Sequence, residues 1–315
     1  MKALVTGAAG FIGSTLSEKL LSDGAEVVGL DCFADYYPRW IKERNLAGLR
    51  PQSGFRLVES TIQAADLGAL LSGTTHVFHL AAQAGVRRSW GQDFQVYTVN
   101  NIEATQVLLE ACCTHAIDRF VYASSSSVYG DLAPIPMRED ALPQPVSPYG
   151  VTKLAAEQLC YLYHVNYGVP TVALRYFTVY GPRQRPDMGF HRFLRAAIRG
   201  EPITLYGDGE QTRDFTFVAD AVTATAAAGA RGVPGAVYNV GGGSRVSINQ
   251  VLDLVGRLVA RPVTIRREPT QKGDMRDTYA DTSRARAELG FAPSVTLEHG
   301  LAAEYRWLAS VPELL

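Results

Sequence analysis

Short apolar runs alternate with longer segments of mixed polarity through the first half of the chain. Between the first two runs, Ile12, Leu16 and Leu20 recur every four residues, as on a helix with one buried face. Because alternating strands and helices are typical of a doubly wound parallel sheet, the pattern predicts an α/β fold. Five runs are predicted to be strands: KALVT (2–6), EVVGLD (26–31), HVFHLAA (76–82), RFVYAS (119–124) and TVALRY (171–176).

The pattern changes near Thr178, where Gly, Pro and Arg become frequent and the apolar runs shorten. One run, AVYNVGGG (236–243), returns to strand character. We expect residues 1–177 to form a nucleotide-binding domain to which residues of about 215–245 return. Residues 178–315 are expected to form mainly a smaller substrate-binding domain.

The 315 residues carry a formal net charge of −1, which gives no general attraction to nucleic acid or anionic lipid. The sequence therefore predicts neither a nucleic-acid partner nor a membrane partner. The N-terminus begins directly with a strand pattern and contains no signal-peptide pattern, and no apolar stretch is long enough to span a bilayer. We expect a soluble cytoplasmic protein.

The cysteines and histidines do not indicate a metal site. Cys32, Cys112, Cys113 and Cys160 lack CxxC spacing, so buried free thiols are expected. The pair His76 and His79 lies within a predicted strand, whose period of two directs the side chains to opposite faces.

Three glycines, Gly7, Gly10 and Gly13, lie between the first predicted strand and the first predicted helix. Glycines at this point allow a tight turn and bring backbone N–H groups close to a pyrophosphate at the helix N-terminus. Asp31 ends the next strand, where a carboxylate accepts hydrogen bonds from ribose hydroxyls and repels a 2′-phosphate. The spacing predicts a Rossmann-type sheet that binds NAD rather than NADP.

Tyr149 and Lys153 form a YxxxK motif, and residues four apart share one helix face. A nearby cation favours the phenolate, so we expect Lys153 to lower the pKa of Tyr149 and make it a usable base. The serine run at 124–127 follows a predicted strand directly. Ligands of open α/β sheets bind at such carboxyl ends of strands, so the serines are expected near the same site.

These motifs resemble the extended short-chain dehydrogenases/reductases of the NDP-sugar epimerase/dehydratase type over nearly the whole chain. The stretches that carry the resemblance are TGAAGFIGS, HLAAQAGVR, NNIEATQVLLEA, YASSSSVYGD, SPYGVTKLAAE, LRYFTVYGPRQRPDM, TRDFTFVAD and GDMRDTYADTSRA. Within this group, DYY after the second strand, QAGVR and YFTVYGP…RPDM are most similar to the UDP-glucuronate 4-epimerases.

The resemblance implies a bound NAD that is regenerated in each turnover. It assigns Tyr149 as the base for the C4 hydroxyl, Lys153 as the residue that holds the ribose, and Ser125 as a hydrogen-bond partner of the reacting oxygen. Relatives usually have GDI where this chain has Ser60, Thr61 and Ile62, so Thr61 would replace the carboxylate that meets the adenine amine. The further cofactor-binding residues implied are Phe11, Ile12, Ile62, Leu80, Ala81, Ala82, Asn101 and Tyr176.

The serines also distinguish this chain from related enzymes with other activities. Related dehydratases carry an acid pair at this point and UDP-glucuronate decarboxylases carry a glutamate, whereas Ser126 and Ser127 are neutral. Hydroxyl groups can donate hydrogen bonds to a uronate that an acidic side chain would repel. We hypothesise that Ser126, Ser127 and Thr178 hold the C6 carboxylate, in a plane that suppresses CO2 loss from the 4-keto sugar. Alternatively, they are only small residues beside the cofactor.

Several other residues are implied to bind the UDP-sugar. Arg185 is a candidate for carboxylate recognition or substrate closure, and a solvated loop arginine is the alternative. Arg213 and Arg276 match positions that bind the diphosphate in relatives, where the planar fork of an arginine suits phosphate oxygens. The implied residues are Arg87, Arg88, Arg213 and Arg276, with Thr204, Leu205 and Tyr206 around the uracil.

The sequence thus favours NAD-dependent 4-epimerisation of UDP-glucuronate to UDP-galacturonate. The alternatives are a UDP-glucose or N-acetylhexosamine 4-epimerase, a UDP-glucuronate decarboxylase, or a non-catalytic NAD-sensing protein. The segments 101–113 and 149–167 are apolar on more than one side. Relatives pair these helices across a dimer, so a homodimer is expected, with deeply buried monomer helices as the alternative.

Overall fold

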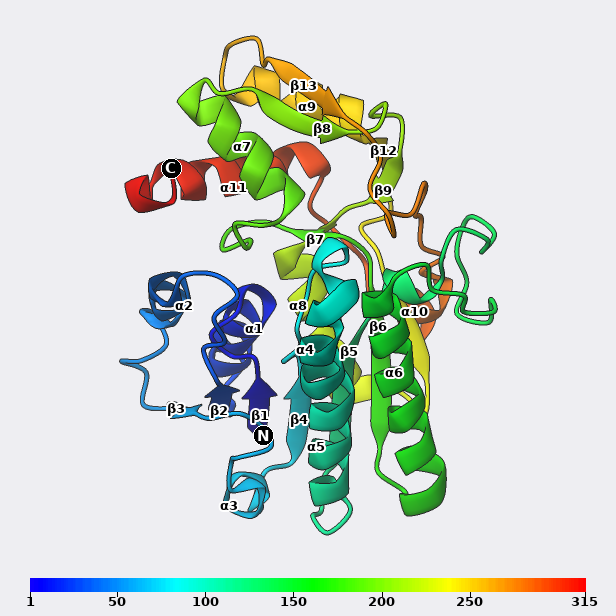
Figure 1. Ribbon diagram of the computed structural model, residues 1–315. Helices are drawn as coiled ribbons and strands as arrows, with labels where there is room; N and C mark the ends of the chain where they lie inside the picture. Colours follow the sequence, from blue (N-terminus) through cyan, green and yellow to red (C-terminus); the bar gives the residue numbers. More distant parts are fainter.

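Seven parallel strands form the central sheet of the computed structural model, which describes residues 1–315 (Figure 1). Their order across the sheet is β11-β6-β5-β4-β1-β2-β3, so the chain reverses its direction of travel between β1 and β4. This arrangement confirms the Rossmann-type α/β fold. The strands are β1 (Lys2–Thr6), β2 (Glu26–Asp31), β3 (Phe55–Glu59), β4 (His76–His79), β5 (Arg119–Ser125), β6 (Thr171–Tyr176) and β11 (Val237–Val240).

The apolar runs locate most of the sheet. Strands β1, β2 and β6 have the predicted bounds, while β4 ends at His79, three residues before the predicted Ala82. Strand β3 was not predicted. It lies at the sheet edge, where its residues are only partly buried, and its sequence FRLVE is therefore not a continuous apolar run.

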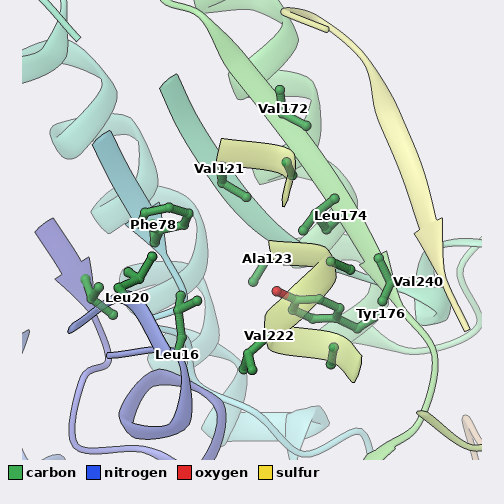
Figure 2. Close-up of a cluster of buried hydrophobic side chains, with 14 of the residues drawn as sticks. Leu16, Leu20, Phe78, Val121, Ala123, Val172, Leu174, Tyr176, Val222 and Val240 are labelled. Atoms are coloured by element: carbon green, nitrogen blue, oxygen red, sulfur yellow. The ribbon is translucent and has the colours of Figure 1, made fainter. Parts of the chain in front are cut away.

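Helices cover both faces of the sheet and bury one apolar cluster on each. One face is covered by α1 (Phe11–Ser22), α8 (Val218–Arg231) and α10 (Ser283–Leu289). Figure 2 shows the core of this face, where Leu16 and Leu20 of α1 and Val222 of α8 point toward the strands. The other face is covered by α3 (Leu67–Leu71), α5 (Ala104–Cys112) and α6 (Pro148–Tyr167). Burying one such aliphatic side chain contributes about 1.5–3 kcal/mol.

A smaller lobe stands above the carboxyl ends of the strands (Figure 1). Its core joins α7 (Gly189–Arg199), α9 (Ile248–Leu258) and α11 (Leu297–Ala309) to β8 (Ile203–Tyr206). Strand β8 pairs in parallel with β13 (Ile265–Glu268), and β9 (Thr212–Asp214) pairs antiparallel with β12 (Arg245–Ser247). The remaining elements are α2 (Arg39–Leu46), α4 (Phe94–Tyr97), a π-helical turn (Thr98–Glu103), β7 (Val179–Tyr180), β10 (Thr216–Phe217) and short 3-10 turns at Arg87–Ser89, Gly91–Asp93, Ser126–Val128 and Pro312–Leu314.

The lobes are not two consecutive halves of the chain. Helix α8 and strand β11 complete the nucleotide-binding half, within the predicted returning segment, and α10 also packs against that half. We propose the division into residues 1–177 with 215–245 and a second lobe from 178, amended by the return of 283–289.

The cysteines are free, and the side chain of His79 is hydrogen-bonded inside the fold. All four cysteines are free, and Cys112 and Cys160 are buried, whereas Cys32 is exposed, contrary to expectation. The ring of His79 is bonded to the hydroxyls of Thr6 (2.8 Å) and Thr105 (2.9 Å). None of the helices combines the length and apolar character that a bilayer crossing requires.

Candidate active site

The glycine turn brings three backbone segments into contact. Gly7 has φ +70°, and a Cβ there would lie 2.9 Å from the backbone nitrogen of Ala81. A Cβ on Gly13 would lie 2.1 Å from the carbonyl oxygen of Gly7, so helix α1 can begin against the turn only if this residue is glycine. The N-terminus of α1 therefore borders the adjoining cavity directly.

This cavity has a volume of about 230 Å³ and lies along the carboxyl ends of the strands. A dinucleotide fits its chemistry, because it combines a helix N-terminus with an acidic strand end. The predicted cofactor residues that line it are Gly7, Gly10, Phe11, Ile12, Gly13, Asp31, Thr61, Ile62, Leu80, Ala81, Ala82, Tyr149, Lys153 and Tyr176. Sequence reasoning missed six further wall residues, because the tertiary fold brings them together from separate segments. They are Tyr36, Tyr37, Lys42 of α2, Gln63, Gln83 and Asn100 of the π-helical turn.

Asp31 is fixed at the end of β2. Its carboxylate accepts hydrogen bonds from the backbone N–H groups of Ala9 (3.0 Å) and Phe33 (2.8 Å), and the ammonium of Lys42 lies 3.4 Å away. The side chain remains at the cavity wall, where its charge favours a ribose with free hydroxyls. The residues present thus fit NAD.

Asn101 does not line the cavity, although it was predicted to bind the cofactor. Its amide oxygen accepts from the backbone N–H of Gln83 (2.7 Å), and its amide nitrogen donates to the carbonyl of Gln83 and the hydroxyl of Thr152, both at 3.0 Å. The π-helical turn turns it inward, so it fixes the segment after β4, while its neighbour Asn100 reaches the cavity.

Tyr149 and Lys153 lie on the first turns of α6. Ser147 caps this helix by accepting a hydrogen bond from the N–H of Gly150 (3.1 Å). The lysine ammonium lies 4.4 Å from the centroid of the Tyr122 ring, and burial lowers the pKa of Lys153 to about 7. Both motif residues therefore face the cofactor cavity from a rigid element.

The pKa of the Tyr149 phenol is not lowered overall, contrary to the expectation from the YxxxK pair. Burial raises the pKa of the Tyr149 phenol, and the groups that act in the opposite direction are the Ser125 side chain and the charge of Arg185. Arg185, from the loop after β7, is thus the cation whose charge favours the Tyr149 phenolate.

Ser124 and Ser125 make different hydrogen bonds at the end of β5. Ser124 donates to the carboxylate of Glu157 at 2.6 Å, and Arg175 holds this buried carboxylate with two hydrogen bonds of 2.6 and 3.1 Å. Ser125 accepts from the N–H of Ser127 (3.1 Å), which bends the chain into a 3-10 turn. The buried ion pair of Glu157 with Arg175 therefore holds the end of β5 in place through the hydrogen bond from Ser124.

A second cavity of about 730 Å³ lies between the sheet and the smaller lobe, and Tyr149 borders both cavities. The predicted substrate residues that line it are Arg87, Arg88, Ser126, Ser127, Thr178, Arg185, Thr204, Leu205, Tyr206 and Arg213, together with the predicted catalytic Ser125. Sequence reasoning missed Tyr36, Asp187, Arg192 of α7, Gln211 and Asp274, which the tertiary fold brings to the wall from separate segments.

Arg276, which was predicted to bind the diphosphate, does not line this cavity. It makes a bidentate pair with Asp208, at 2.9 and 3.1 Å, on the exposed surface. Arg213 does line it, yet its guanidinium donates to backbone carbonyls, including those of Thr212 (2.8 Å) and Met275 (2.7 Å). Arg213 therefore also supports the loop that carries Arg276.

Arg87 and Arg88 contact different segments of the cavity wall. Arg87 pairs with Asp274 at 2.6 Å and lies 4.2 Å from the centroid of the Tyr206 ring, which joins the two lobes. Arg88 lies 5.2 Å from the centroid of the Tyr36 ring. Both arginines thus contact residues from other parts of the chain that line the same cavity.

A glycine-turn cofactor cavity with a Tyr–Lys pair at its boundary to a second cavity defines the extended short-chain dehydrogenase/reductase class. The chain belongs to the NAD dependent epimerase/dehydratase family, whose sequence model matches residues 3–241.

Three proteins show to which members of this family the chain is similar. An uncharacterized UDP-glucose epimerase, YtcB of Bacillus subtilis (strain 168), is 45% identical over 313 residues, with 99% of each chain covered. A UDP-glucuronate 4-epimerase of Thermodesulfobacterium geofontis (strain OPF15) is 38% identical and covers 99% of this chain and 97% of its own. The crystal structure of UDP-glucuronic acid 4-epimerase from Bacillus cereus with UDP-glucuronic acid and NAD has a TM-score of 0.96 and 45% identity, covering 98% of this chain and 99% of that one.

Proposed function

We propose that this protein catalyses the NAD-dependent 4-epimerisation of UDP-glucuronate to UDP-galacturonate. The observation that carries the proposal is the group of uncharged hydroxyls, Ser126, Ser127 and Thr178, in the same cavity as Tyr149. The 45% identity and TM-score of 0.96 to the UDP-glucuronic acid 4-epimerase of Bacillus cereus support it. These three side chains are uncharged, whereas the carboxylates that line the same cavity, Asp187 and Asp274, are paired with Arg185 and Arg87.

Each catalytic residue has a role that its position supports. Tyr149 takes the proton of the C4 hydroxyl and returns it after inversion, and Ser125 donates a hydrogen bond to the same oxygen. Lys153 holds the ribose of the cofactor beside Tyr149. When bound, NAD accepts the C4 hydride and gives it back to the opposite face of the 4-keto sugar. The remaining cofactor-cavity residues position the dinucleotide.

The hydroxyls of Ser126, Ser127 and Thr178 donate to the uronate carboxylate. The 4-keto sugar is a β-keto acid, which loses CO2 when the C5–C6 bond stands perpendicular to the carbonyl plane. Donors that hold the carboxylate can keep this bond near the plane, so the electron pair of the bond does not flow into an enolate. Arg213 and Arg87 are the arginines available for the diphosphate, and Thr204, Leu205 and Tyr206 surround the base.

The main alternative is a UDP-glucose 4-epimerase, which the name of the Bacillus subtilis relative favours. A decarboxylase is disfavoured because Ser127 is not an acid, and an NAD sensor is disfavoured because Tyr149 and Lys153 both line the cavity. Purified protein is incubated separately with UDP-glucuronate and UDP-glucose, and the products are separated by chromatography. UDP-galacturonate as the main product supports the proposal. UDP-pentose would identify a decarboxylase, and turnover of UDP-glucose alone would identify a neutral-sugar epimerase.

We further propose a homodimer formed by α6 and the α4–α5 segment. Large apolar side chains are exposed on this face, which is unusual for a monomer surface. They are Val96, Val99, Val151, Tyr161, Leu162, Val165 and Tyr167. Light scattering should give twice the monomer mass, and Leu162→Lys should halve it. The control Leu142→Lys, at an exposed leucine outside this face, should leave the mass unchanged. A wild-type monomer contradicts the proposal.

We propose that the enzyme works in the cytoplasm, since free thiols suit a reducing compartment. Cell fractionation, with antibodies against the protein, tests this location.

A further inference from the structure

Two motifs that are far apart in sequence meet at the boundary of the two cavities. Tyr36, in DYY after β2, donates a hydrogen bond of 3.2 Å to the carboxylate of Asp187 in RPDM. The same carboxylate binds the guanidinium of Arg185 through two hydrogen bonds of 3.0 and 3.1 Å. The neighbouring Arg185 is thus held by a carboxylate of the chain itself.

This group is positioned to act on a bound sugar. Arg185 and Tyr36 line both cavities, and Asp187 lines the larger one. The charge of Arg185 acts on the Tyr149 phenol. The Tyr36 hydroxyl lies so close to Gly85 that a Cβ on that residue would clash with it. The guanidinium is therefore held close to the point where the C4 oxygen of the sugar reacts.

The pair of Arg185 with Asp187 can exchange partners. The Asp187 side chain is 36% exposed and that of Arg185 is 21% exposed. Because both side chains are partly exposed and line the cavity, a second carboxylate that enters it can compete for the guanidinium. A uronate is such a carboxylate, whereas the hydroxymethyl group of a neutral hexose is not.

We propose that Asp187 is a specificity-determining residue that competes with the uronate of the substrate for Arg185. This inference rests on the proposed function. The 4-keto sugar must turn over between the two hydride transfers. A permanent ion pair of its carboxylate with Arg185 would oppose that rotation, whereas the hydroxyls of Ser126 and Ser127 bind more weakly. By competing for Arg185, Asp187 thus weakens the binding of the substrate and allows the rotation that turnover requires.

The test is Asp187→Asn, which keeps the size of the side chain and removes its charge. We expect the dissociation constant of UDP-glucuronate, measured by calorimetry, to fall about tenfold, the effect of one added charge-assisted hydrogen bond. The turnover number should fall as well, while the dissociation constant of UDP-glucose should not change. Tyr36→Phe should shift the same quantities in the same direction by less, and Asp187→Glu should restore the wild-type values.

The matched control is Asp140→Asn. Arg138 and Asp140 have the same spacing in sequence and a similar bidentate geometry, 3.1 and 3.2 Å, but lie outside both cavities. This variant should leave both dissociation constants unchanged. Equal changes for the two sugars in Asp187→Asn, or weaker binding of UDP-glucuronate, would overturn the inference and make Asp187 only a support for Arg185. A wild-type protein that makes no UDP-galacturonate contradicts the proposed function instead, and the binding comparison still decides the role of Asp187.

Discussion

The ammonium of Lys153 lies over the ring of Tyr122, 4.4 Å from its centroid, and both side chains are buried. A ring face attracts a cation, but burial in this position still lowers the pKa of the lysine to about 7. This relationship and three others lead to specific predictions.

The ligand-free protein should gain stability as the pH rises from about 7 to about 10.5 through Lys153. In this window the unfolded chain keeps the lysine proton and the folded chain has released it. Because the unfolded state then binds more protons, the free energy of unfolding increases with pH. Urea denaturation across this range checks the slope. Lys153→Met should lack this contribution, and identical slopes in both proteins would contradict the lowered pKa.

Tyr149→Phe should reduce turnover about 10²–10⁴-fold, because it removes the group that exchanges the C4 proton. Binding of UDP-glucuronate, measured by calorimetry, should persist, since the ring remains in place. Tyr305→Phe in α11 is the control and should retain wild-type turnover. Substantial epimerisation by the Tyr149 variant would assign the base to another residue.

Glu157→Ala should destabilise the protein by about 3–5 kcal/mol, because it leaves the buried Arg175 without a countercharge. The two side chains are only 2% and 4% exposed. Ser124 also loses its acceptor, so the end of β5 should loosen. Urea denaturation measures the loss. As a comparison, Asp140→Ala breaks an exposed ion pair and should cost no more than about 1 kcal/mol. Similar losses in both variants would contradict a special role of the buried pair.

Gly13→Ala should abolish retention of NAD, because its Cβ would lie 2.1 Å from the carbonyl oxygen of Gly7 and push the turn away from α1. NAD released from the purified protein by heating is measured by its absorbance. Gly24→Ala is the control: unlike Gly13, Gly24 has a positive φ of +84°, and nothing lies within 4 Å of its Cβ position. It should cost about 1–2 kcal/mol of stability and no cofactor. Full retention of NAD by the Gly13 variant would show that the turn tolerates a side chain.

The sequence predicts those parts of the fold that local patterns determine. Continuous apolar runs locate the buried strands, and the glycine spacing locates the turn before α1. The edge strand β3 was not predicted, because Arg56 interrupts its apolar residues and Glu59 ends them. An edge strand needs only one covered side, so its composition resembles that of a loop.

The same distinction between local patterns and tertiary contacts applies to the residues of the candidate site. Tyr149, Lys153 and the serines lie within motifs whose spacing fixes their mutual positions. Asn101 was placed in the cavity by resemblance, but the π-helical turn directs its amide to Gln83. Arg276 was placed there too, yet Asp208, distant in sequence, binds it outside. Pairings between distant loops depend on the tertiary fold, and local spacing does not encode them.

Strand β11 has a consequence for biosynthesis. It pairs with β6, yet much of the smaller lobe lies between them in the chain. A ribosome must therefore complete Val240 before the nucleotide-binding sheet can close, and until then the β6 edge lacks its neighbour. Exposed edges of this kind invite pairing with other chains. Nascent protein is thus at greatest risk of aggregation late in its synthesis, when most of the sheet already exists.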